Sequence, residues 1–241
     1  MTDSRYLKRT IVKEVIASTF LDEERSLRIY LPPGYNEVLS YPVVYCQDGE
    51  EFFNFGRIAT TANQLILDEG VEPFIIVGIE VDVKKRTAEY APFGNRHEAY
   101  VRCIMEEIIP FVEQKYRARS ENRLLAGDSL GGSMSLHLSL LYPGEFPRII
   151  SLSGAYYEES QNIIARESDL SWLDIYMIVG LQEDAYETDH GTFDFVDLNQ
   201  RTRDLLLQKA ATVQYAEKDG KHLWGFWQKE LPDALLYFLT R

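Results

Sequence analysis

The segment 127–131 reads Gly-Asp-Ser-Leu-Gly, so Ser129 stands between two glycines, and a third glycine follows at position 132. The sequence predicts a strand over 123–126 before it and a helix over 129–142 after it. A serine on such a tight turn has a strained backbone with neighbouring chain close by, so only very small residues fit beside it. The helix N-terminus below its oxygen favours developing negative charge. We therefore predict that Ser129 is a nucleophile; the alternative is a plain turn between strand and helix.

A serine hydroxyl needs a base within hydrogen-bonding reach, and that base needs an orienting partner. The chain has four histidines, at positions 97, 137, 190 and 222. Where the nucleophile lies on a strand-to-helix turn, the chain order is serine, acid, histidine. This order excludes His97, and His137 lies inside the helix after the serine, where packing is its expected role. His222 is favoured as the base because it follows a further strand and has aromatic neighbours; His190 remains the alternative.

Two carboxylates are candidates for the orienting acid. Glu183 and Asp184 both follow the predicted strand 173–179, and either can accept the second imidazole hydrogen and fix the tautomer. Asp189 and Asp194, further along the same loop, are weaker candidates. Asp48 precedes the serine and so breaks the expected chain order. The residues alone leave the choice between Glu183 and Asp184 open.

An ester-cleaving serine also needs backbone N–H groups that stabilise the oxyanion. One belongs to the residue after the nucleophile, Leu130, and the second comes from the loop after an early strand. Here that loop is 47–50, where Gly49 lets the chain turn toward the site and makes the Glu50 N–H the predicted donor. Each such donor is typically worth about 10²–10³ in rate.

Strands alternate with helices along the chain, which predicts one α/β domain over 1–241. We expect a doubly wound, mostly parallel sheet with helices on both faces and two antiparallel strands, 10–19 and 25–31, at its start. The other strands are predicted over 41–46, 73–79, 123–126, 148–152, 173–179 and 212–216. Helices are predicted over 57–69, 97–116, 129–142, 158–166, 197–208 and 226–239, and 80–96 is predicted to be a long polar loop. The residues named above follow predicted strands, at the edge where ligands bind in such sheets.

Composition and charge narrow the class of protein. The 241 residues include 25 Lys and Arg against 38 Asp and Glu, a net charge of −13. Such a surface repels nucleic acid and anionic membranes, so neither is an expected partner. The N-terminus lacks an apolar signal segment and no apolar run approaches about 18 residues, which favours a cytoplasmic protein. Cys46 and Cys103 are expected to be buried thiols, and no cysteine–histidine cluster indicates a metal site. Nothing indicates the oligomeric state.

Together these residues resemble the putative-esterase family of α/β-hydrolases, which includes enterochelin esterases, esterase D, feruloyl and acetylxylan esterases and bacterial mycolyltransferases. The resemblance covers nearly the whole chain. It runs through Leu-Pro-Pro-Gly-Tyr (31–35), Gln-Asp-Gly-Glu (47–50), Gly-Asp-Ser-Leu-Gly-Gly (127–132), Ser-Leu-Ser-Gly (151–154), Val-Gly-x-x-Glu (179–183) and Gly-x-His-x-Trp (220–224). It implies an α/β-hydrolase fold and a catalytic step without metal or organic cofactor.

By this resemblance, Ser129 matches the nucleophile, His222 the base and Glu183 the acid, with the neighbouring Asp184 as the alternative. Glu50 and Leu130 match the oxyanion positions. The resemblance implies a serine hydrolase that cleaves small-molecule carboxylic esters through an acyl-enzyme, either enterochelin-esterase-like or a short-acyl esterase. An acyltransferase of the same fold and a catalytically silent binding protein are the alternatives.

Three residues are candidates for the substrate pocket. Arg86, in the basic stretch 82–86, is expected either to contact an anionic substrate or to be a solvated loop charge. Tyr156 and Trp224 are expected either to line an acyl or alcohol pocket or to serve as packing residues. The sequence does not name the acyl or alcohol part of the substrate.

Overall fold

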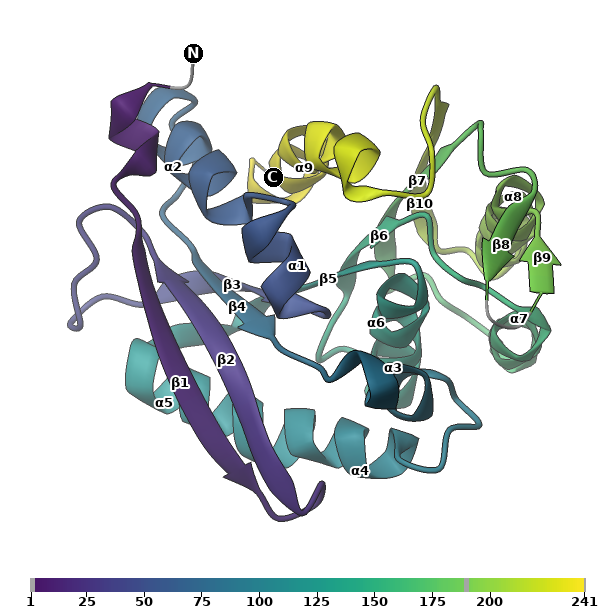
Figure 1. The fold of residues 1–241 in the computed structure, drawn as a ribbon, viewed down its shortest axis with the longest axis horizontal. Coiled ribbons are helices and arrows are strands. Elements are labelled where there is room, and N and C mark those ends of the chain that lie inside the picture. The colour runs from purple at the N-terminus through teal and green to yellow at the C-terminus, as the bar shows by residue number, and fades with distance from the viewer. Residues whose placement is uncertain (1–2, 189–190, 241) are drawn as a thin grey trace.

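An eight-stranded sheet forms the centre of the computed structural model, which describes residues 3–188 and 191–240 (Figure 1). The strand order is β1-β2-β4-β3-β5-β6-β7-β10. The strands are β1 (Thr10–Ser18), β2 (Glu23–Leu31), β3 (Tyr41–Cys46), β4 (Ile75–Ile79), β5 (Ala118–Asp128), β6 (Arg148–Leu152), β7 (Asp174–Gly180) and β10 (Thr212–Lys218). β2 pairs antiparallel with β1 and β4, and all other pairs are parallel. The predicted mostly parallel sheet with antiparallel N-terminal strands is confirmed.

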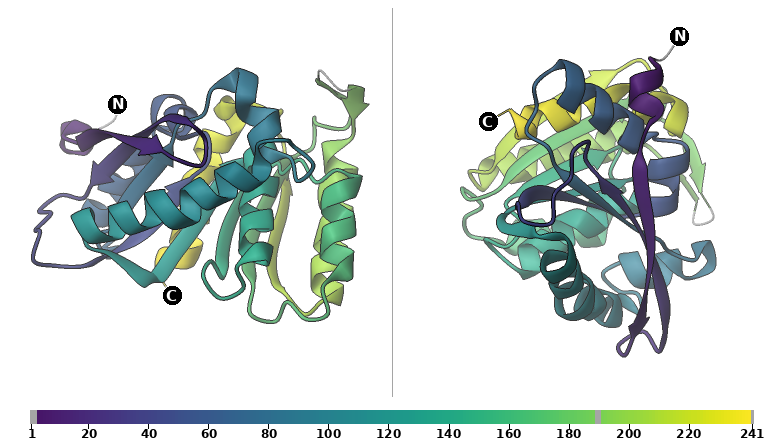
Figure 2. Two further views of the ribbon diagram at one scale, coloured as in Figure 1. Left: turned by 90° about the horizontal axis from the view of Figure 1, so that it is seen from below. Right: turned by 90° about the vertical axis from the view of Figure 1, so that its left-hand side faces the viewer.

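Helices cover both faces of the sheet, as the strand sequences require. β3 is buried along its whole length, and its residues alternate between two cores: Val43 and Tyr45 belong to one, Val44 and Cys46 to the other. A strand that is apolar on both sides needs a helical layer on each. α1 (Gly49–Asn54), α2 (Ile58–Asp68) and α9 (Trp224–Leu239) contribute to the second core. Helices α4 to α8 contribute to the first, across which the long helix that includes α4 and α5 runs (Figure 2).

The remaining helices, apart from α3 and η1, lie where the sequence predicts helices. They are α3 (Val83–Tyr90), α4 (His97–Arg102), α5 (Ile109–Tyr116), α6 (Leu130–Leu141), α7 (Glu158–Arg166) and α8 (Phe195–Gln208), with a 3₁₀ turn, η1 (Ser4–Leu7), near the N-terminus. A π-helical segment, η2 (Cys103–Ile108), joins α4 to α5 just before Pro110. Proline has no N–H for the preceding turn, and such wide turns accommodate this loss. The predicted helix over 97–116 is thus present as three joined segments.

Three stretches differ from the sequence-based expectation, and the first is 49–54, where helix α1 was not predicted. The predicted loop 80–96 is wrong in part, because it contains helix α3. This helix begins with the Asp82 side chain accepting a hydrogen bond from the Lys84 N–H, and only Glu89 and Tyr90 are buried. A helix with so short a buried face leaves little apolar periodicity to detect. The loop after β7 contains a small hairpin of β8 (Tyr186–Thr188) and β9 (Gly191–Phe193).

Candidate active site

Ser129 lies on the turn between β5 and α6 with a strained backbone, at φ 51° and ψ −121°. A non-glycine residue rarely adopts a positive φ, and strain of this kind clusters at functional sites. The close approach of strand and helix explains the flanking glycines. A Cβ at Gly127 would overlap the carbonyl of Gly131, and a Cβ at Gly131 would lie 2.8 Å from Oδ2 of Asp48. The turn therefore holds the serine hydroxyl above the end of the sheet.

His222 contacts the serine directly. Its Nε2 lies 2.9 Å from Ser129 Oγ, although 93 residues separate the two in sequence. The imidazole is buried among aromatic rings, with centroids of Tyr186 and Phe195 at 4.3 Å and of Trp227 at 4.9 Å. These rings restrict the orientation of the imidazole and its access to water. Along the chain the three side chains follow the predicted order Ser129, Glu183, His222, whereas in space His222 lies between the other two.

Glu183 contacts the other nitrogen of the same imidazole. Its Oε2 lies 2.6 Å from His222 Nδ1, and its carboxylate is fully buried. Its Oε1 accepts hydrogen bonds of 2.8 Å from Ser153 Oγ and from the Gly180 N–H. These hydrogen bonds fix the positions of both carboxylate oxygens. Ser153, which sequence reasoning missed as a contributor, is itself held by the Trp227 indole N–H at 2.8 Å.

The other acid and base candidates lie elsewhere. Asp184 is exposed, and the imidazole of His222 contacts the carboxylate of the preceding Glu183 instead. Asp194 caps the start of α8, where its side chain accepts from the Asp197 N–H. Asp189 and His190 lie outside the described residues. Of the described candidates, only Glu183 contacts the imidazole.

Both predicted oxyanion donors lie in the first turns of helices. Glu50 is the second residue of α1, and Leu130 is the first residue of α6. N–H groups in a first turn have no acceptor within their helix. Across residues 3–188 and 191–240, neither of these two N–H groups donates a hydrogen bond to another part of the chain. Both remain free to bind a negatively charged oxygen beside Ser129.

An arginine–carboxylate cluster lies next to the serine. Arg86 Nε and Nη2 donate to the two oxygens of Asp48 at 2.7 and 2.8 Å, and Nη2 also lies 3.3 Å from the carbonyl of Asp128. Burial is the largest influence on Arg86 and lowers its pKa, but the charge and hydrogen bonds of Asp48 together with the charge of Asp128 outweigh burial and raise the pKa. Burial, and then the charge of Asp48, raise the pKa of the Asp128 carboxyl well above its usual range. Arg86 thus lies at the site as expected, but its charge is paired within the protein.

Two cavities meet at Ser129. The small cavity, of about 380 Å³, is lined by His222, Trp224, Trp227 and the carboxylates of Asp48, Glu50 and Glu51, among others. The large cavity, of about 670 Å³, is lined by Phe93, Leu130, Tyr157, Phe193 and Leu198, among others. Ser129 and Arg86 line both. Trp224 therefore lines a cavity as predicted, and its indole N–H donates to Glu51 at 2.8 Å.

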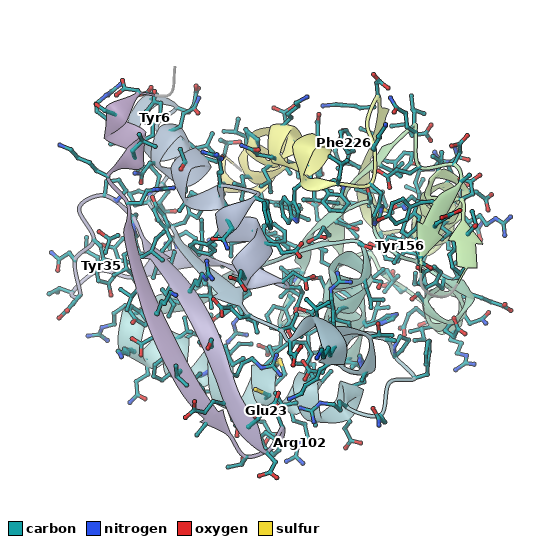
Figure 3. The ribbon with its side chains drawn as sticks, viewed as in Figure 1. Tyr6, Glu23, Tyr35, Arg102, Tyr156 and Phe226 are labelled. Carbon is teal, nitrogen blue, oxygen red and sulfur yellow. The ribbon has the colours of Figure 1, made fainter. Side chains whose placement is uncertain are left out.

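Tyr156 does not line either cavity, and its expected role in the pocket is wrong. The side chain, labelled in Figure 3, is fully buried. Its hydroxyl donates to Ser151 Oγ at 2.7 Å. The ring packs against Gly154, which holds it under the end of β6. Phe193, from the hairpin after β7, lines the large cavity and was not predicted, because its hairpin carries no clear strand pattern.

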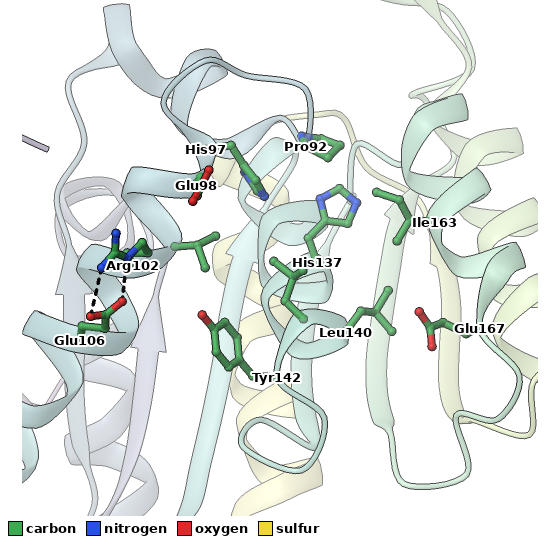
Figure 4. A pocket seen from close by; sticks show the side chains of 12 residues that line it. Pro92, His97, Glu98, Arg102, Glu106, His137, Leu140, Tyr142, Ile163 and Glu167 are labelled. Carbon is green, nitrogen blue, oxygen red and sulfur yellow. Dashed lines mark hydrogen bonds and ion pairs between the residues drawn. The ribbon is translucent and has the colours of Figure 1, made fainter. Parts of the chain in front are cut away.

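A third cavity, the outer cavity, of about 610 Å³, lies over the outer side of α6 and does not include Ser129 (Figure 4). His97 and His137 line it, but neither contacts the serine. Burial lowers the pKa of His137 to about 3, so this imidazole is neutral, consistent with a packing residue. His97 uses its Nδ1 to contact the Glu89 carbonyl at 3.0 Å. Among the described residues, no three metal-binding side chains gather at one point, and no helix is long and apolar enough to cross a membrane.

Comparison with protein families gives a match to the model described as "Putative esterase" over residues 18–238. The chain is 34% identical over 230 residues to the uncharacterized protein YjcH of Bacillus subtilis (strain 168), covering 94% of this chain and 96% of that protein. It is 29% identical over 149 residues to an endo-1,4-beta-xylanase/feruloyl esterase of Xylanibacter ruminicola, covering 55% of this chain and 20% of the relative.

Solved structures share the fold at low sequence identity. A ferulic acid esterase superposes with a TM-score of 0.83 at 17% identity, covering 96% of this chain and 98% of its own. The enterobactin esterase FES from Shigella flexneri superposes with a TM-score of 0.79 at 19% identity, covering 95% of this chain and 60% of its own. At these identities the likeness shows a shared fold.

Proposed function

The chain belongs to the putative esterase family of ester hydrolases, and from this premise we propose that it is a serine hydrolase that cleaves carboxylic esters through an acyl-enzyme. One observation carries the proposal: an unbroken line of hydrogen bonds runs from Ser129 through His222 to Glu183. This arrangement supplies a nucleophile, a base and an orienting acid in the geometry that acyl transfer needs.

The reaction follows from the hydrogen bonds. Ser129 Oγ attacks the ester carbonyl while His222 Nε2 takes the serine proton, and Glu183 stabilises the imidazolium that forms. The carbonyl oxygen becomes an oxyanion, which the free N–H groups of Glu50 and Leu130 bind. When the intermediate collapses, His222 returns the proton to the leaving alcohol. Water then attacks the acyl-enzyme by the same steps in turn and releases the acid and the free serine.

The position of His222 assigns the two cavities to the two halves of the substrate. The imidazole must protonate the leaving oxygen, so the alcohol lies on the side where His222 lines the wall. Among the cavities that meet at Ser129, His222 lines the small one and not the large one. The large cavity, with its wall of Phe93, Tyr157 and Phe193, then takes the acyl group. Its apolar walls favour an acyl group with a substantial apolar body.

The charged residues that line the small cavity limit the charge that the alcohol part of the substrate can carry. Asp48, Glu50 and Glu51 contribute carboxylates there, and Arg86, the cation that lines this wall, is paired with Asp48. The Glu50 carboxylate is ion-paired with Arg28 at 2.8 Å, which leaves Glu51 to repel an anionic alcohol. We therefore expect an uncharged or cationic alcohol part, which counts against the anionic substrate considered for Arg86.

The test is active-site labelling combined with hydrolysis of a p-nitrophenyl acyl ester. A fluorophosphonate probe should label the wild-type protein at Ser129, and Ser129→Ala should abolish both labelling and hydrolysis. The matched control is Ser171→Ala, which removes an exposed hydroxyl far along the chain. Unchanged hydrolysis in Ser129→Ala would overturn the proposal. Absent labelling together with absent hydrolysis would favour a binding protein on a hydrolase fold.

A further inference from the structure

One arginine connects the two segments that carry the proposed oxyanion donors. Arg86 holds both carboxylate oxygens of Asp48, two residues before Glu50, and also lies 3.3 Å from the carbonyl of Asp128, one residue before Ser129. It comes from α3, which packs beside α6 (Figure 1). Two parallel N–H···O bonds fix direction as well as distance, as arginine–carboxylate pairs do.

The backbone of Asp48 sets the direction of the Glu50 N–H. Asp48 has left-handed backbone angles, φ 52° and ψ 46°, at the point where the chain turns into α1. Its carbonyl accepts from the Glu51 and Phe52 N–H groups at 2.9 and 3.2 Å, while its own N–H donates to the Tyr90 hydroxyl at 3.0 Å. Tyr90 also belongs to α3, so this one helix holds both the side chain and the backbone of Asp48.

The same carboxylate also rests against the helix that carries the second donor. A Cβ at Gly131 would lie 2.8 Å from Asp48 Oδ2, so the carboxylate is packed on the first turn of α6. Leu130, whose N–H is the second proposed donor, is the preceding residue. Asp48 therefore touches the segments of both donors, and Arg86 fixes Asp48.

Burial makes this pair hard to rearrange. The Asp48 side chain is only 5% exposed and that of Arg86 23%. Leaving either charge buried without its partner would carry a large penalty, so the paired geometry is the stable one. An exposed ion pair would change its geometry readily and would do little to fix the positions of neighbouring groups.

From these contacts we infer that Arg86 and Asp48 are positioning residues that hold the Glu50 and Leu130 N–H groups at the separation an oxyanion needs. The inference rests on the proposed esterase function. The pair contributes to the stabilisation of the tetrahedral intermediate and not to binding of the ground-state ester. A misplacement of about 1 Å at such donors is enough for a loss of about 100-fold.

The experiment compares Arg86→Met and Arg86→Lys with wild type in hydrolysis of one p-nitrophenyl ester and in inhibition by phenylboronic acid. The boronate forms a negatively charged tetrahedral adduct on a serine, so it reports the oxyanion donors separately from ester binding. We expect kcat to fall about 10- to 100-fold in Arg86→Met with KM nearly unchanged, and boronate affinity to fall in parallel. Arg86→Lys should recover part of both. The matched control is Lys84→Met, which removes an exposed charge from the same helix.

Two further variants keep the inference testable if Arg86→Met does not fold. Tyr90→Phe removes only the hydroxyl that holds the Asp48 N–H, and should lower kcat and boronate affinity together. Asp48→Asn weakens the same pair from its other side while keeping the shape of the side chain, and should also lower kcat and boronate affinity together.

The outcomes separate the two proposals. If the wild-type protein hydrolyses the ester and the folded Arg86 and Tyr90 variants keep normal kcat and boronate affinity, the positioning role is overturned. The esterase function is then intact. A rise in KM with kcat unchanged would also overturn the positioning role, since Arg86 would then be a substrate contact. A wild-type protein without hydrolysis or Ser129 labelling would overturn the esterase function and this inference with it.

Discussion

Oε2 of Glu183 lies 2.6 Å from Nδ1 of His222, while Oε1 of the same carboxylate is occupied by the Ser153 hydroxyl and the Gly180 N–H. The two oxygens therefore have separate tasks. One faces the imidazole, and the other anchors the carboxylate to the end of β7. Because the anchor fixes which oxygen faces the ring, it also fixes the imidazole tautomer, with the proton on Nδ1 and a free lone pair on Nε2 toward Ser129.

Glu183→Gln should therefore be severely impaired. The Ser153 and Gly180 donors will keep the amide oxygen in the anchored position, so the amide NH₂ faces His222 Nδ1. The ring then carries its proton on Nε2 and cannot accept the serine proton. We expect kcat to fall by about 10²–10⁴ with the fold retained. Steady-state hydrolysis of a p-nitrophenyl ester measures this.

The matched control for that change is Asp184→Asn, one residue along the chain and exposed. It removes a carboxylate of the same charge without touching the imidazole, so kcat should hardly change. A large loss in Asp184→Asn with normal activity in Glu183→Gln would reverse the assignment of the acid.

Phe193→Ala should change acyl preference. The Phe193 ring packs 4.6 Å from that of Tyr157 in the wall of the large cavity, and its removal takes away apolar contact area on the acyl side. We expect kcat/KM for a p-nitrophenyl ester with a long acyl chain to fall by about tenfold relative to the acetate, roughly the effect of one or two lost methylene contacts.

The control for the cavity prediction is Phe55→Ala, which removes an exposed phenyl ring that lines neither cavity at Ser129. A series of esters with one leaving group and increasing acyl length reads out the acyl side alone. If Phe193→Ala altered only the dependence on the leaving alcohol, the assignment of the two cavities would be the wrong way round.

Gly131→Ala should damage both stability and activity. The new Cβ would lie 2.8 Å from Asp48 Oδ2 and 3.0 Å from Gln47 Cβ, and Arg86 prevents the carboxylate from moving away. Overpacking of this kind costs about 1–3 kcal/mol of unfolding free energy. Gly34→Asn is the control, because no atom lies within 4 Å of the added Cβ and asparagine tolerates the positive φ of 74° at this position. Equal melting temperatures and kcat for wild type and Gly131→Ala would contradict the close approach.

The stability of the protein should depend on pH through His137. In the folded protein this imidazole stays neutral down to a pKa of about 3, whereas the unfolded chain binds its proton near pH 6.5. Between these values the unfolded state holds one more proton, so stability falls as the pH falls, by about 1.4 kcal/mol per pH unit from this group. His137→Leu cannot take up that proton, so its stability should fall less steeply from pH 6.5 to 4. Urea unfolding at several pH values measures how the free energy of unfolding depends on pH. The same pH dependence in wild type and His137→Leu would contradict this prediction.

The sequence predicts where the strands end and which site residues lie there, because both are indicated by short local motifs. A buried apolar run before Gly-x-Ser-x-Gly, and a glycine before the acid, are readable in a single chain. The choice of Glu183 over Asp184 is not, because it depends on a turn in which the Glu183 N–H binds the Gly180 carbonyl and directs one side chain inward. Tyr156 illustrates the same limit, since only the packing around Gly154 shows that its ring faces the core.

The role of α3 was hidden for a different reason. Half of its eight residues are charged, and its contacts with Asp48 are made by Arg86 and Tyr90, four positions apart. A polar helix of two turns has no apolar stripe by which the sequence pattern could indicate it. The role of Arg86 can be recognised only in the fold, where a carboxylate distant in sequence lies beside it. Pairings between residues about 40 positions apart need the fold before they can be seen.

The two cavities at Ser129 have walls from different parts of the chain, and this has a consequence for how such proteins diversify. The small cavity draws on α1 and the start of α9, and the large one on α7 and α8, while α3 and the β8–β9 hairpin contribute to both. Substitutions in α7 or α8 can alter the choice of acid without disturbing the choice of alcohol, and the reverse holds for α9. Selection can therefore act on each half of the ester separately, while the shared Ser129 keeps its position between the two cavities.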